Sequence, residues 1–167
     1  MAALIRADQL ISSLGSRSTC LIRMLEQELM PAAGDASRYS LSGADVVLDP
    51  HCAYALSLLF HELATNAVRH GSLSNQEGHV EVSWRVEDAE LVLSWIECGG
   101  PQVRRPSSPG FGSLLVTHAA VKLGGSATML YLPSGLRCDL RVSLLPPSPR
   151  RRVGMFLATP MTPVRVM

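Results

Sequence analysis

Apolar residues recur at helical spacing in four segments of the chain, each bounded by residues that favour turns. We expect helices over these four segments, which are residues 2–14, 20–30, 50–70 and 113–123. Ser18 or Thr19 is placed to cap the second helix. The stretch 31–36, which begins with a proline, is expected to end that helix.

The third helical segment has the strongest boundaries. It begins at Asp49-Pro50, an N-terminal cap followed by a proline in the first turn. Gly71 follows its last apolar residue, where a C-terminal glycine is common. One stripe along this helix is apolar and consists of Leu56, Leu59, Leu63 and Ala67. This segment is therefore expected to be a core helix.

Alternating apolar and polar residues predict strands between and after the helices. These strands are expected at residues 38–42, 46–48, 79–86, 90–96, 126–131 and 136–144. Short turns at 87–89 and 133–135 join the last four strands into two hairpins. The order of helices and hairpins predicts an α+β fold, a two-layer α/β sandwich. Its sheet is expected to be mainly antiparallel and covered on one face by helices.

The 167 residues are 47% apolar and 17% charged, with a formal net charge of +1. This balance is typical of one globular domain. It excludes a bulk nucleic-acid binder or a membrane-surface binder. No apolar run reaches the roughly 20 residues of a membrane span, so we expect a cytoplasmic location. The four cysteines are too widely spaced for a metal knuckle or a C-x-x-C pair and are expected to be reduced thiols.

The sequence H-E-L-A-T-N-A-V-R-H-G, residues 61–71, places polar side chains within the core helix. Glu62 and Asn66 are four residues apart and share one helix face, and His70 extends that line by another turn. A carboxylate and an amide oxygen are hard donors that suit a magnesium ion. The alternative is a solvated helix face that happens to lie near Gly71.

Two further motifs follow this helix. In S-W-I-E-C-G-G-P, residues 94–101, a strand ends in Glu97, whose carboxylate can accept a hydrogen bond from an exocyclic amine such as that of adenine. In P-G-F-G-S-L-L, residues 109–115, two glycines precede a helix whose first N–H groups suit a phosphate. Arg104 and Arg105 in the intervening loop could neutralise phosphates. Each motif alone is equally compatible with an ordinary turn.

Taken together, the order and spacing of these motifs resemble the ATP-binding domain shared by gyrase-type, chaperone and mismatch-repair ATPases and histidine kinases. The resemblance implies the Bergerat-type fold, with a mixed, mainly antiparallel sheet. Residues 61–71 resemble the N box of the HWE class of bacterial sensor histidine kinases, and Trp95-Ile96-Glu97 resembles its second signature. The segments E-L-M-P (28–31), G-F-G-S and L-G-G also fall where this class has similar sequences. The resemblance covers about residues 2–145.

The resemblance implies a role for each matching residue. Asn66 would bind the magnesium ion that bridges the ATP phosphates. Glu62 would orient a magnesium-bound water or the attacking group, and His70 would approach the phosphates. Glu97 would read the adenine amine, and Gly99 would let the base approach.

A flexible lid over the phosphates is also implied. It would contain Gly110, Phe111, Gly112 and Ser113. His61 would have a structural or positioning role, and Trp95 would pack in the core.

The resemblance also implies partners. The phosphoacceptor histidine of this class lies on a dimerising helix in a motif like H-R-x-x-N, which this sequence lacks. Residues 1–30 are therefore expected to be a remnant of dimerisation and linker helices, 31–145 the ATP-binding domain and 146–167 a disordered tail. The γ-phosphoryl group would pass to a histidine of another segment or chain, then to a response-regulator receiver domain. A dimer could form through the N-terminal helix.

Two departures from the class bear on activity. Ser107, Ser108 and Pro109 stand where the class tends to have an arginine, and Leu114 stands where it often has a basic residue. Fewer cations should weaken phosphate binding or turnover. Three alternatives are a degenerate, non-catalytic nucleotide-binding or phosphotransfer module, a serine kinase of the anti-sigma type and a pure interaction module. The Trp95-Ile96-Glu97 signature argues against the second.

Overall fold

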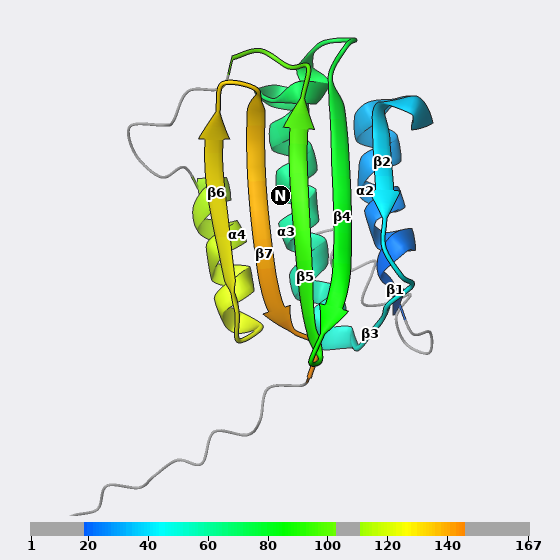
Figure 1. Ribbon diagram of the computed structural model, residues 1–167, viewed down its shortest axis with the longest axis vertical. Coiled ribbons are helices and arrows are strands. Elements are labelled where there is room, and N and C mark those ends of the chain that lie inside the picture. The colour runs from blue at the N-terminus through cyan, green and yellow to red at the C-terminus, as the bar shows by residue number, and fades with distance from the viewer. Residues whose placement is uncertain (1–18, 103–110, 146–167) are drawn as a thin grey trace, which may run out of the picture.

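The computed structural model describes residues 19–102 and 111–145. Within these residues, a five-stranded sheet forms one layer, and three α-helices cover one of its faces (Figure 1). The strand order is β2-β4-β5-β7-β6. The helices are α2 (Leu21–Ala33), α3 (Pro50–Arg69) and α4 (Phe111–Lys122), and the sheet strands are β2 (Tyr39–Ser42), β4 (His79–Glu87), β5 (Glu90–Cys98), β6 (Ser126–Leu132) and β7 (Gly135–Ser143). The predicted α+β two-layer sandwich is confirmed.

Helix α3 lies behind the centre of the sheet and has the predicted boundaries. The Asp49 side chain caps it by accepting hydrogen bonds from the backbone N–H groups of His51 and Cys52. Pro50 occupies the first turn, where its missing N–H costs nothing. The predicted apolar stripe is fully buried: Leu56, Leu59, Leu63 and Ala67.

Helix α2 differs from its prediction at both ends. Thr19 and Cys20 form a short strand, β1, paired with β3 (Val47–Leu48), so Thr19 does not cap the helix. The stretch 31–36 ends the helix, as expected, but Pro31 itself lies inside α2, because in the last turn a proline removes only one backbone donor. The helix ends at Gly34, whose φ of +73° is readily adopted by glycine.

The sheet combines two predicted hairpins with one unpredicted pairing. Strands β4 and β5 pair antiparallel and are joined through Asp88 and Ala89, both at positive φ. Strands β6 and β7 form the second hairpin, and β7 pairs antiparallel with β5. Strand β2 pairs parallel with β4, which no local pattern in the sequence indicates. The sheet is therefore mixed and mainly antiparallel, as predicted.

Strand β5 shows how the sheet separates the core from the open face. Its side chains alternate, so that every second one, from Leu91 through Leu93 and Trp95 to Glu97, is buried on the helix-covered face. Ser94, from the other set, is only partly buried and bonds to Asp139 on the open face. Among the residues that the structure describes, Glu97 is thus the one charged residue that is buried.

Several sequence predictions concern residues outside the described ranges: the helix at 2–14, the loop arginines 104 and 105, Gly110 and the tail 146–167. The domain boundary at residue 30 remains a prediction, but α2 crosses it and its buried residues belong to the common core. All four cysteines are free, as expected. Within 19–102 and 111–145, no helix is long and apolar enough to span a membrane.

Replacing Leu59 by alanine tests the core assignment. Leu59 is fully buried on α3, so Leu59→Ala should lower the free energy of unfolding by about 2–5 kcal/mol. Leu114→Ala on α4, where the side chain is 57% exposed, should change it by less than about 0.5 kcal/mol. Urea unfolding followed by circular dichroism measures both. Equal effects from the two substitutions would contradict the assignment.

Candidate functional site

The described parts of the three sequence motifs lie near one end of the central strand β5. The C-terminal end of α3 lies at this end of β5 (Figure 1). A 3-10 turn, Ser72–Ser74, connects α3 towards β4 and packs against the end of α3. The start of α4 packs against the polar face of α3.

Glu97 is buried at the centre of this region, with only 2% of its surface exposed. Its Oε2 accepts a hydrogen bond from the backbone N–H of Ser72 at 2.9 Å. Its Oε1 accepts one from the indole Nε1–H of Trp95 at 3.3 Å. Burial raises the pKa of this carboxyl above its ordinary value, and the two donors partly oppose that rise. Trp95 is fully buried, as the prediction of core packing requires, and its indole also binds Glu97.

Close backbone packing around Ser72 requires glycines. A Cβ at Gly71 would overlap Oε2 of Glu97, and one at Gly78 or Gly100 would overlap the backbone of Ser72. Gly71 directly follows the capping residue His70, where the sequence predicted a C-terminal glycine. Its φ is −107°, which other residues adopt, and what demands glycine is the adjacent carboxylate.

A hydrogen-bond network that the sequence analysis did not predict holds the loop of residues 71–78 in place. The Asn75 side chain accepts from the N–H groups of Glu77 and Gly78 and donates to the carbonyl of Gly99 at 3.0 Å. Arg38 donates to the carbonyls of Ala33, Asn75 and Gly78. The turn-forming residues 75–78 were visible in the sequence. Nothing local connects Arg38 to them, because it lies 37 residues earlier than Asn75.

Glu62 and Asn66 lie together on α3, as predicted, and they face the start of α4. An added Cβ at Gly112 would lie 3.0 Å from Glu62 Oε2 and 3.1 Å from Asn66 Nδ2. The Glu62 carboxylate and the Asn66 amide therefore lie next to the backbone at the N-terminus of α4, where the first N–H groups are not bonded within the helix. This donor set fits a magnesium ion bound with phosphate, since both supply hard oxygens. The start of α4 also contains Phe111 and Ser113.

His70 and His61 occupy different surroundings. His70 is the C-terminal capping residue of α3: its backbone N–H bonds to the carbonyl of Asn66 at 2.9 Å and its side chain is exposed. Its role at the phosphates remains a prediction. His61 is partly buried, and its Nδ1 lies 2.9 Å from Glu28 Oε2 on α2. This pair joins α2 to α3, which agrees with a structural role for His61.

Gly99 is required by its own backbone conformation. Its φ is +72°, and a Cβ there would lie 2.7 Å from the carbonyl oxygen of Glu77. Its predicted role in admitting a base remains a prediction, and the turn alone already explains the glycine.

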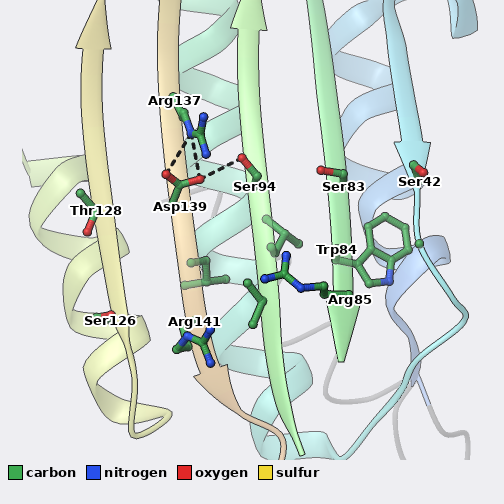
Figure 2. Close-up of a pocket in the computed structure, with 14 residues that line it drawn as sticks. Ser42, Ser83, Trp84, Arg85, Ser94, Ser126, Thr128, Arg137, Asp139 and Arg141 are labelled. Atoms are coloured by element: carbon green, nitrogen blue, oxygen red, sulfur yellow. Dashed lines mark hydrogen bonds and ion pairs between the residues drawn. The ribbon is translucent and has the colours of Figure 1, made fainter. Parts of the chain in front are cut away.

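A cavity of about 520 Å³ lies on the opposite, open face of the sheet (Figure 2). Its charged side chains are already paired: Arg137 binds Asp139, and Arg141 binds Glu90. The motif residues 61–71, 97–99 and 112–113 do not line it. This cavity is therefore a solvated sheet face, separate from the site built around Glu97.

Comparison with known families agrees with the geometry. Residues 30–125, more than half of the chain, match the family described as the histidine kinase-like ATPase domain. The chain belongs to this family. The match includes the end of α2 and extends through α3, both strands of the first hairpin and α4, so it covers every part of the site.

The relatives of this histidine kinase-like ATPase domain include light-regulated kinases. It is 38% identical over 115 residues to blue-light-activated histidine kinase 1 of Erythrobacter litoralis (strain HTCC2594), covering 67% of this chain and 32% of that protein. It is 36% identical over 116 residues to a blue-light-activated histidine kinase of Brucella abortus (strain 2308), covering 66% and 24%. The chain spans about a third or less of the length of these curated relatives.

Solved structures share the fold of this ATPase domain. The blue-light activated histidine kinase of Erythrobacter litoralis EL346 superposes with a TM-score of 0.61 at 19% identity, covering 74% of this chain and 40% of that one. The catalytic domain of histidine kinase ThkA gives 0.58 at 11% identity, covering 77% and 97%. The ATP-binding domain of PrrB from Mycobacterium tuberculosis gives 0.53 at 20% identity, covering 77% and 96%. The Bergerat-type fold inferred from the motifs is confirmed.

The raised pKa of Glu97 gives the domain a specific pH dependence. The folded chain holds the Glu97 proton more tightly than the unfolded chain, so ionisation of this group lowers stability. The free energy of unfolding of the native chain, measured relative to Glu97→Gln, should therefore fall as pH rises above the ordinary value of 4.5. It should level off once pH passes the folded pKa. Urea unfolding of both proteins between pH 4 and 8 measures this difference. Parallel stability curves would contradict the buried, proton-retaining carboxyl.

Proposed function

We propose that this chain binds ATP with magnesium and is the catalytic domain of a sensor histidine kinase. The γ-phosphoryl group is transferred to a histidine supplied by another segment or another chain. A response-regulator receiver domain then accepts it. The observation that carries this proposal is the convergence of Glu62 and Asn66 with the start of α4, beside the buried Glu97.

The two ends of the site suit the two ends of ATP. The buried Glu97 carboxylate accepts a hydrogen bond from the exocyclic amine of the base, whose apolar rings suit the surrounding core. The polar face of α3 and the N-terminus of α4 receive the phosphates. The two regions adjoin, because the N–H of Gly71, next to Glu97 Oε2, bonds to the carbonyl of Asn66 at 3.0 Å.

The residues of α3 divide the chemistry between them. The Asn66 amide oxygen binds the magnesium ion, which, when bound, neutralises the phosphate charge that develops during transfer. Glu62 accepts a hydrogen bond from a bound water or from the attacking imidazole and fixes its direction. The imidazole nitrogen forms the new bond to phosphorus as the bond to the β-phosphate oxygen breaks, and ADP leaves.

A non-catalytic nucleotide-binding module is the second candidate, favoured by one observation. Leu114, where related kinases often have a cation, is 57% exposed at the start of α4 and supplies no charge to phosphates. Phosphoryl transfer depends mainly on positioning and charge neutralisation, so a site short of cations binds ATP but turns it over slowly.

Asn66→Ala tests the nucleotide site. Losing a ligand to the magnesium–phosphate unit should weaken ATP binding about 10–100-fold, the effect of losing a hydrogen bond to a charged group. Thr65→Ala changes the adjacent residue, which lines the groove between α2 and α3, and should leave binding unchanged. Calorimetry with and without magnesium measures both. Failure of the native chain to bind ATP would refute the proposed function.

Glu62→Gln separates binding from transfer. The dissociation constant for ATP should change little, whereas the rate of phosphohistidine formation should fall by about 10²-fold or more, as for loss of a positioned acid–base group. Radiolabelled ATP and an added dimerisation-helix fragment with an acceptor histidine supply the assay. Glu26→Gln, on the exposed face of α2, is the control. A detectable native rate that Glu62→Gln leaves unchanged would remove Glu62 from the mechanism, and no transfer despite ATP binding would favour the non-catalytic module.

A further inference from the structure

We propose that Trp95 is a positioning residue for nucleotide recognition: its indole N–H holds one carboxylate oxygen of Glu97 where it can accept a hydrogen bond from the base. This inference rests on the proposed function, in which Glu97 contacts the base. It assigns a functional reason to a tryptophan that the sequence indicates only as core packing.

The geometry gives each carboxylate oxygen one donor. Trp95 and Glu97 are two residues apart on β5, so both side chains emerge on the same face. The indole Nε1 lies 3.3 Å from Oε1, and the backbone N of Ser72 lies 2.9 Å from Oε2. Both residues are buried, so neither the indole donor nor the carboxylate is satisfied by bulk water. A carboxylate oxygen can accept more than one hydrogen bond, so Oε1 retains capacity for a ligand amine.

No cation contacts the Glu97 carboxyl among the described residues, so its two N–H donors stabilise the ionised form. On the strands beside β5, Cys138 of β7 is the titratable side chain on the same buried side of the sheet as Glu97. His79 and Glu81 on β4, and Arg137 and Asp139 on β7, lie on the open side, and His70 after α3 is exposed. Burial raises the pKa of Cys138 to about 12, so that thiol is neutral, and the ring of His79 lies 3.3 Å from the Ser40 hydroxyl. Among the described residues, the donors that contact the Glu97 carboxyl are therefore the backbone N–H of Ser72 and the indole N–H of Trp95, with no cation among them.

The structure provides a matched control for the test. The chain has two tryptophans, and Trp84, on β4, also donates its indole N–H, to the carbonyl of Ala44 at 2.8 Å. Trp84 is likewise buried, but it packs against Gly43 at the far end of β4 from the site. Trp84→Phe and Trp95→Phe therefore remove the same atoms and one indole hydrogen bond each. They differ in whether Glu97 loses a donor.

The first test is the dissociation constant for magnesium-ATP measured from pH 5 to pH 9. Trp95→Phe should weaken binding about tenfold near neutral pH, the scale of one hydrogen bond to a charged group. It should also move the pH below which binding is lost upward by roughly one unit, because the ionised carboxyl has lost a donor. Trp84→Phe should change neither quantity. Identical pH profiles for the two variants would overturn the proposal.

The second test needs no nucleotide and no substitution at Trp95. In Trp84→Phe, Trp95 is the remaining tryptophan, and its fluorescence should titrate with the ionisation of Glu97. The double variant Trp84→Phe/Glu97→Gln should lose that titration. If the Trp95 fluorescence titrates with Glu97 but the chain does not bind ATP, the proposed function is refuted, although the Trp95–Glu97 hydrogen bond is supported. A fluorescence that does not respond to Glu97 would overturn the proposal whether or not ATP binds.

Discussion

The burial of the Glu97 carboxylate near the end of the central strand β5 constrains the structure around it. An ionisable group in this position needs hydrogen-bond donors, and the loop after α3 supplies one from the backbone of Ser72. That contact brings the end of α3 so close to β5 that residue 71 has no room for a side chain. The same close packing requires Gly78 and Gly100 around Ser72. One buried charge thus accounts for the position of a helix end, the path of a loop and three glycines.

Helix α3 connects this carboxylate to the polar groups nearer α4. Its apolar stripe is fixed against the sheet, which leaves Glu62 and Asn66 directed towards Gly112. In its last turn, the carbonyl of Asn66 accepts a hydrogen bond from the backbone N–H of Gly71. The helix therefore sets the spacing between the group that reads the base and the groups that face the phosphates. Its own position is fixed by burial, by the Asp49 cap and by the His61–Glu28 pair with α2.

The sequence predicted those features that depend on local periodicity or capping. The boundaries of α3 and both hairpins follow from such patterns. The parallel pairing of β2 with β4 and the contacts of Arg38 with the 75–78 turn join segments far apart in the chain, which no local pattern encodes. Helix α2 runs past Pro31 because the cost of a proline depends on its position in the helix, and the crowding at Gly71 comes from Glu97 on β5, which the sequence around Gly71 does not encode.

Nuclear magnetic resonance of the ¹⁵N-labelled chain during titration with magnesium-ATP tests the central claim most directly. The two indole N–H signals report separately on Glu97, through Trp95, and on the far end of β4, through Trp84. The account predicts that the Trp95 indole and the amides of Ser72 and Gly112 shift on binding, while the Trp84 indole stays in place. Shifts confined to the open-face residues that line the cavity in Figure 2, or no shifts at saturating ATP, would contradict it.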